Sequence, residues 1–136
     1  MFGSCLCKEV KYEVVALAGP IVHCHCTTCR KAHAAAFAST ARANKEDFSI
    51  LSGQHQIKSF ESSTGKLRHF CLNCGTHIFA ELQNQSQVII RVATLDNDPE
   101  VTPVASIWVS HSVPWLEYAA NIRSFPEVPQ LPGPTK

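Results

Sequence analysis

The chain has 136 residues and a mass of 14.9 kDa, which is enough for one domain with one core and too little for a two-domain enzyme. With 45% apolar and 17% charged residues and a mean hydropathy of -0.03, the composition excludes a disordered chain and a membrane protein. The formal net charge is +1, without blocks of like charge, so we expect neither nucleic acid nor a membrane as a partner.

The predicted elements are short strands, and they indicate a mainly β fold. In chain order, alternating or β-branched runs predict strands at residues 10–14, 56–60, 88–92 and 107–109. The one helix that we expect begins near Thr28, which would be its N-cap, and ends near Ala36. Because no segment has a long apolar stripe of helical period, helices are not expected to build the core.

The C-terminal segment is rich in proline. Four prolines lie within residues 126–136, and proline cannot join the central strands of a sheet. We therefore predict a single zinc-binding domain over residues 1–125, followed by a loose proline-rich tail over residues 126–136. Shortly before this tail, Trp108 and Trp115 are expected to anchor the core, which is the commonest role of large aromatic side chains.

Seven cysteines and seven histidines are unusual in so short a chain. The start of the chain contains charged Lys and Glu side chains where a secretory signal would have an apolar run, so we expect a cytoplasmic protein. Thiols stay reduced in the cytoplasm, and clustered cysteines there indicate metal or redox sites before disulfides. The clusters are Cys5-x-Cys7, Cys24-x-Cys26-x-x-Cys29 and Cys71-x-x-Cys74.

Cys71 and Cys74 have the spacing of a zinc knuckle, in which a tight turn directs two sulfurs at one tetrahedral ion. Gly75 follows directly and can adopt the left-handed backbone geometry that such a turn uses. Since a knuckle supplies only two ligands, we predict that Cys5 and Cys7 complete a closed structural zinc site. A redox Cys-x-x-Cys pair is the less favoured alternative, because that motif normally begins a helix in a βαβ unit, which this sequence lacks.

Cys24, Cys26 and Cys29 supply three thiolates within one short segment and leave one position of a tetrahedral zinc ion unassigned. An open position is what catalysis at zinc requires. The alternative is a second structural zinc closed by a histidine, for which the candidates are His23, His25, His33 and His69. Spacing alone leaves the open and the closed site equally possible, and either one gives two zinc ions per chain.

Several segments carry a family resemblance: GSCLC at 3–7, CHCTTCRK at 24–31, FCLNCGT at 70–76, LD at 95–96, IWV at 107–109, PW at 114–115 and FP at 125–126. In this order they resemble the glutathione-dependent formaldehyde-activating enzyme family. The resemblance implies a β-tent fold of stacked antiparallel sheets with zinc sites. It also implies a structural zinc at Cys5, Cys7, Cys71 and Cys74, and a catalytic zinc at Cys24, Cys26 and Cys29.

The resemblance further implies a carbon–sulfur lyase or synthase whose small-molecule partner is a thiol, glutathione, which it joins to formaldehyde. The thiol would take the fourth position on the catalytic zinc, where the metal lowers the pKa of the thiol. Beside the three cysteines, Arg30 and Lys31 are predicted to hold the carboxylates of the substrate, although solvated charges on a short helix would look the same. His25 or His33 could move the proton.

Two further hypotheses compete with the enzyme. In the first, both zinc ions are structural and the surface recognises a protein or a modified thiol without catalysis. In the second, the cysteine clusters form a thiol redox protein, which would give a defined disulfide with a mild oxidant. Displacement of the fourth ligand by an added thiol would distinguish the enzyme from the binding module.

Overall fold

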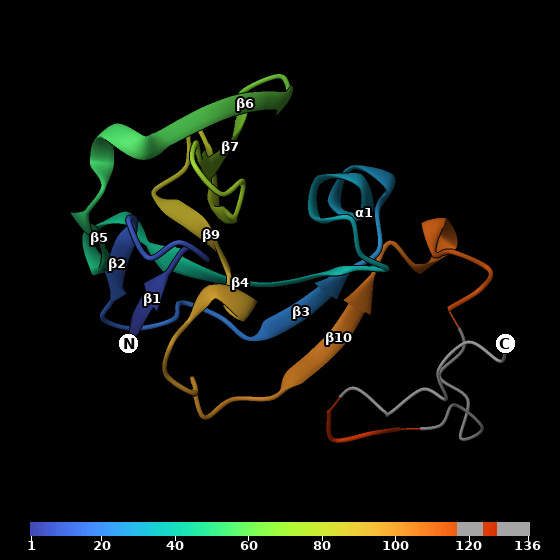
Figure 1. Ribbon diagram of the computed structural model, residues 1–136. Coiled ribbons are helices and arrows are strands. Elements are labelled where there is room, and N and C mark those ends of the chain that lie inside the picture. Colours follow the sequence, from blue (N-terminus) through green and yellow to red (C-terminus); the bar gives the residue numbers. More distant parts are fainter. Residues whose placement is uncertain (117–123, 128–136) are drawn as a thin grey trace, which may run out of the picture.

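Two β-sheets make up most of the computed structural model, which describes residues 1–116 and 124–127 (Figure 1). The smaller sheet has the order β1-β2-β5, and the larger has the order β10-β3-β4-β9-β8-β7-β6. Among the described strand pairs only β3 and β10 run parallel. The strands are β1 (Phe2–Ser4), β2 (Lys11–Val14), β3 (Ile21–Cys24), β4 (Ala38–Asn44), β5 (Phe48–Ser52), β6 (Ile57–Ser63), β7 (Lys66–Cys71), β8 (His77–Leu82), β9 (Gln87–Arg91) and β10 (Pro103–Ile107). The mainly β class is therefore confirmed.

Helices are few and short in the described residues. The one α-helix, α1 (Thr27–His33), follows β3 and lies beyond the ends of β3 and β10, far from the sheet that contains the N-terminus (Figure 1). The single turns of 3-10 helix are η1 (Lys45–Asp47), η2 (Gln54–Gln56), η3 (Val92–Thr94) and η4 (Val109–His111).

The core lies between the two sheets. From the smaller sheet, Tyr12 and Val14 are fully buried, as the alternation along this strand predicts. They pack in one cluster with Val88 and Ile90 of β9, and burial of each such aliphatic side chain contributes about 1.5–3 kcal/mol. Gly3 pairs with Tyr12 across the smaller sheet, and a Cβ there would overlap the Tyr12 ring, so the close approach of β1 requires glycine.

The opposite face of the larger sheet positions the site. Side chains of directly paired residues point to the same face, so the strand register identifies which ones share it. The pairs on this face are Val22 with Thr40, Thr40 with Arg91, Arg42 with Ile89, and Arg68 with Ala80. The residues between them along each strand face the core. Strands β4, β7 and β9 thus contribute polar and cationic side chains to one surface, and α1 covers part of it.

The predicted strands at 10–14, 56–60 and 88–92 are confirmed as β2, β6 and β9. The prediction for residues 107–109 is wrong beyond Ile107, because Trp108 has a left-handed backbone with φ 58° and starts a turn of 3-10 helix. The helix also begins earlier than predicted. Its N-cap is Cys26, whose sulfur accepts a hydrogen bond from the Cys29 N–H, so Thr28 lies inside the helix. It ends at His33 rather than near Ala36.

From residue 128 onward, the predicted tail at 126–136 lies outside the described residues. The domain boundary near residue 125 therefore stays a prediction. In the described part of the chain, no helix is long and apolar enough to span a membrane.

Candidate metal centres and substrate cavity

The first cysteine cluster joins the two sheets. Cys5 and Cys7 lie in the turn after β1, Cys71 ends β7, and Cys74 lies in the turn before β8. Their four sulfurs all lie within 4.8 Å of one another, with Cys5 to Cys7 at 3.4 Å and Cys7 to Cys71 at 3.8 Å. Four thiolates at the usual zinc–sulfur distance of about 2.3 Å lie roughly 3.8 Å apart in a tetrahedron. The sulfur spacing therefore suits a closed tetrahedral metal site.

The turn geometry of this cluster is that of a knuckle. Gly75 has a left-handed φ of 75°, as predicted, and its N–H donates to the Cys71 carbonyl oxygen. Although burial opposes ionisation of Cys74, hydrogen bonds with the Thr76 hydroxyl and with backbone N–H groups lower its pKa to about 5. The Val10 N–H donates to the Cys5 sulfur at 3.3 Å. Backbone donors thus stabilise negative charge on these sulfurs, which is the form that binds a metal.

The second cluster is built from one continuous segment. Cys24 ends β3, Cys26 caps α1, and Cys29 lies one turn into α1, where it is buried. Their sulfurs also lie within 4.8 Å of one another. Burial raises the pKa of Cys24 to about 12, so this thiol would be protonated if no cation were close to it, whereas the pKa of Cys26 is lowered because hydrogen bonds with Cys29 and Cys24 outweigh its burial. Three converging sulfurs of this kind fit a soft divalent metal, which supplies the missing positive charge.

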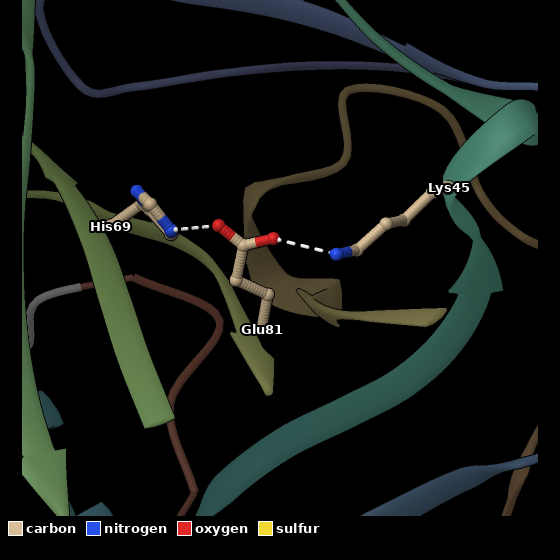
Figure 2. A network of polar contacts seen from close by, with 3 residues as sticks. All are labelled: Lys45, His69 and Glu81. Atoms are coloured by element: carbon tan, nitrogen blue, oxygen red, sulfur yellow. Dashed lines mark hydrogen bonds and ion pairs between the residues drawn. The ribbon is translucent and has the colours of Figure 1, made fainter. Parts of the chain in front are cut away.

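In the described residues, no histidine, aspartate or glutamate places a ligand atom with the three sulfurs of this second cluster. Two of the four candidate histidines, His69 and His23, are held by other side chains. His69 pairs with Glu81 at 3.0 Å on the core-facing side of β7, and Lys45 holds the other oxygen of Glu81 at 3.0 Å (Figure 2). His23 stacks on Phe37, with ring centroids 4.3 Å apart.

The remaining two candidates, the buried His25 and the half-buried His33, do not join the cluster. The His25 ring is 1% exposed and packs against Phe37 at 5.1 Å. The His33 ring lies 5.0 Å from the ring of His77. Burial and the positive charges nearby lower the pKa of His33 to about 3, so it is neutral at physiological pH. Among the described residues, the second cluster is therefore open, whereas the first is closed.

A cavity of about 630 Å³ lies over the open cluster. It occupies the face of the larger sheet opposite the core and is closed on one side by the start of α1. The residues that line it include Val22, Cys24, Cys26, Thr27, Thr28, Cys29, Thr40, Arg42, Ser62, Lys66, Arg68, Ile89, Arg91, Ile107, Trp108 and His111. The cavity is large enough for a small-molecule ligand and gives it access to all three sulfurs.

Two arginines in this cavity are almost fully buried. Arg68 is 2% exposed, and it donates to the Ser62 hydroxyl at 2.9 Å and to the Cys29 sulfur at 3.8 Å. Arg91 is 4% exposed and pairs across the sheet with Thr40. The sequence analysis missed both residues. In the sequence, each is one arginine within a segment that forms a strand, β7 for Arg68 and β9 for Arg91. Buried arginines are rare, so their burial in the structure suggests a function.

A comparison with known protein families identifies a family whose matched region contains both cysteine clusters. The profile of the family described as glutathione-dependent formaldehyde-activating enzyme matches residues 1–111, which include both cysteine clusters. The chain belongs to this family. The resemblance noted in the sequence is therefore confirmed.

Two relatives extend the comparison. An uncharacterised lyase of Schizosaccharomyces pombe is 29% identical over 82 residues, which are 60% of this chain and 58% of the relative. The chain thus matches little more than half the length of that curated relative. The crystal structure of a Rhodobacter sphaeroides protein superposes with a TM-score of 0.64 at 25% identity and covers 78% of this chain and 99% of that chain. The name of the first relative describes that protein as a lyase, and the second comparison supports the fold.

The predicted substrate-binding residues of this family member lie outside the cavity. Arg30 donates to the His25 carbonyl oxygen at 3.2 Å and to the Thr27 hydroxyl at 3.4 Å, which orients its side chain along α1. Lys31 lines a second hollow, of about 570 Å³, between α1 and strands β6 and β7. Their role as carboxylate ligands stays a prediction.

The expectation for the tryptophans is wrong. Trp108 is 59% exposed and Trp115 is 69% exposed, so neither anchors the core. Trp108 follows the last residue of an edge strand and turns away from the sheet, which leaves its ring at the side of the cavity, 5.5 Å from the ring of His111. Aromatic residues are good core anchors only where a second layer covers them, and in the described residues nothing covers this edge.

Proposed function

We propose that the protein is a zinc-dependent lyase that makes and breaks a carbon–sulfur bond, like an S-(hydroxymethyl)glutathione synthase acting on glutathione and formaldehyde. The observation that carries this proposal is the cluster of Cys24, Cys26 and Cys29, which has no fourth protein ligand among the described residues and opens on a cavity. Catalytic zinc sites typically have three protein ligands and one exchangeable position. The proposal includes a second, structural zinc in the four-cysteine cluster.

The reaction that we assign is an addition. Zinc bound to the three thiolates would accept one further ligand and lower the pKa of a thiol in that position. The sulfur of glutathione attacks the carbonyl carbon of formaldehyde, a carbon–sulfur bond forms, and the C=O double bond becomes a single bond. The oxygen takes up a proton and the thiol loses one, so the product is a hydroxymethyl thioether and no oxidant is needed. The reverse reaction releases the aldehyde.

Residues of the chain would orient the substrate and exclude water. The walls of the cavity hold the thiol beside the cluster, and Arg30 and Lys31 are assigned to the carboxylates of glutathione that extend beyond it. His111 lines the cavity and is therefore a better placed proton carrier than His25 or His33, which do not. We place the protein in the cytoplasm, where thiols stay reduced.

The test is native mass spectrometry of the reduced protein with and without glutathione, followed by an assay of S-(hydroxymethyl)glutathione formation. We expect two zinc ions and one glutathione per chain, and loss of one zinc and of the glutathione in Cys26→Ala. An exposed charge change on β6, Lys58→Gln, is the matched control and is expected to behave as the wild type. Two zinc ions without glutathione binding would contradict the enzyme and favour the binding module.

A further inference from the structure

The buried arginines of the cavity have hydrogen-bond donors that no described residue satisfies. Nη1 of Arg68 and both Nε and Nη2 of Arg91 are buried and have no acceptor within the described part of the chain. Leaving a buried donor unsatisfied destabilises the folded protein, and more so when the group is charged. Such donors are retained where a ligand supplies the acceptor, which makes these two guanidinium groups candidates for ligand binding.

The rest of the cavity has the same sign of charge. Arg42 and Lys66 line it together with Arg68 and Arg91, and none of the described lining residues is an aspartate or glutamate. These four cations outnumber the three cysteine thiolates even before a divalent metal is counted. A ligand that brings only a thiolate would leave this cavity positively charged, so a second anionic group on the ligand is favoured.

The donors lie close to the open cluster. Nη2 of Arg68 is 3.8 Å from the Cys29 sulfur, and the other nitrogens of its guanidinium group lie in the same plane. Charge-assisted hydrogen bonds to carboxylates are about 2.7–2.9 Å long. A carboxylate that contacts this guanidinium group therefore lies only a few bonds from a sulfur that occupies the fourth position of the cluster.

We propose that Arg68 and Arg91 form a carboxylate-binding subsite, and that the substrates of this protein include thiols whose carboxylate lies within a few bonds of the sulfur. This inference rests on the proposed function, since it assumes that a thiol reaches the open cluster. This subsite differs from the one assigned above to Arg30 and Lys31 of α1, which would bind the carboxylates of glutathione farther from its sulfur. The guanidinium group of arginine suits this role because it can bind both oxygens of one carboxylate.

The electrostatics of Arg91 agree with an anionic ligand. Burial and the positive charge of Arg68 lower its pKa to about 10, and the negative charge of the three cysteines opposes this decrease. Neutralisation of the cysteines by the arginines is the competing explanation. It accounts for the hydrogen bond between Arg68 and Cys29 but not for the unsatisfied donors of Arg91.

The test compares two ligands of nearly equal shape, 3-mercaptopropionate and its neutral amide, by titration calorimetry on the zinc-loaded protein. We expect the carboxylate to bind roughly tenfold to a hundredfold more tightly than the amide. In Arg91→Gln this preference falls to within about threefold while the amide binds as before, and Lys58→Gln keeps the full preference. Arg91→Lys keeps the charge and is expected to retain only part of the preference, because lysine cannot form the bidentate contact.

The outcomes separate the two proposals. Equal binding of both ligands to the wild type overturns the carboxylate subsite and leaves the proposed function intact. Failure of both ligands to bind a protein that carries two zinc ions and binds glutathione overturns this inference alone, and failure of glutathione to bind as well overturns the proposed function. If Arg91→Gln does not fold, the same two ligands are compared on the wild type and on Arg91→Lys. An unchanged preference for the carboxylate in Arg91→Lys, with the amide bound as tightly as by the wild type, would show that Arg91 is not part of the subsite.

Discussion

The two cysteine clusters use the same ligand atom in different ways. Cys5 and Cys7 meet Cys71 and Cys74 from segments more than sixty residues apart, and both Cys5 and Cys71 belong to the core. Cys24, Cys26 and Cys29 come from one segment and face a cavity. Under the proposed function, a metal site that connects distant segments would contribute to folding, whereas a local site with one ligand too few would be free to bind a substrate.

Strand β7 connects the two clusters. Cys71 lies on its core-facing side as a member of the closed cluster, and Arg68 lies on the other side, where it reaches Cys29 of the open cluster. Loss of the closed site should therefore disturb the open one, because it releases the end of β7. Loss of the open site should leave the closed site in place. The following predictions test this asymmetry.

The largest expected effect is that of Cys71→Ala. This substitution leaves three ligands for a metal that joins the two sheets, and it should destabilise the fold by more than about 3 kcal/mol. Thermal unfolding followed by circular dichroism, with metal content measured in parallel, checks this expectation. Unfolding at the wild-type temperature with only one metal ion lost would show that the closed cluster is not structural.

Cys26→Ala is the matched variant in the open cluster. We expect one metal ion to be lost and glutathione binding to fall by more than about a hundredfold, because the remaining two sulfurs cannot hold zinc firmly. The free energy of unfolding should change by only about 1–2 kcal/mol, since Cys26 caps one end of a short helix. A collapse as large as that of Cys71→Ala would abolish the distinction between the clusters.

Acid should destabilise the fold through His33, the last residue of α1. The pKa of His33 is about 3 in the folded protein, below the value of about 6.5 that it has in an unfolded chain. The unfolded state therefore binds more protons below pH 6.5, and stability falls as the pH decreases from there toward 3. We expect His33→Gln to reduce the proton uptake on unfolding by up to about one proton. Denaturant titrations between pH 5.5 and 7.5, with metal release monitored, measure how the free energy of unfolding depends on pH. The same pH dependence in His33→Gln and in the wild type would contradict the lowered pKa of His33.

The smallest effect is expected for Glu81→Gln. The pKa of Glu81 is lowered because Lys45 and His69 together outweigh the burial that would raise it, so its stabilising contribution is present at neutral pH and lost in acid. The pair with Lys45 is partly exposed to solvent, which limits the loss to about 0.5–1 kcal/mol. Metal content and thiol binding should stay at wild-type values, because Glu81 faces away from the cavity. A loss of thiol binding would show that the two faces of the larger sheet are coupled.

Much of the site could be predicted because the spacing of cysteines is a local signal. Cys24, Cys26 and Cys29 lie close in space whatever surrounds them, and a knuckle such as Cys71 to Gly75 forms from its own turn. The strand β2 was likewise visible because its apolar and polar residues alternate, and β9 because it is a run of β-branched residues. The predicted burial of Trp108 was wrong because burial depends on which layer covers a strand, and the local pattern does not contain that information.

The sequence by itself therefore determined the two cysteine clusters that could hold metal ions, the mainly β class and the family. The tertiary structure decided that no described histidine completes the second set, and that Arg68 and Arg91 meet beside it. The physical reason is the register of the larger sheet. A period of two residues indicates which side chains share a face within one strand, but strand order and pairing decide which strands bring their charges to the same cavity.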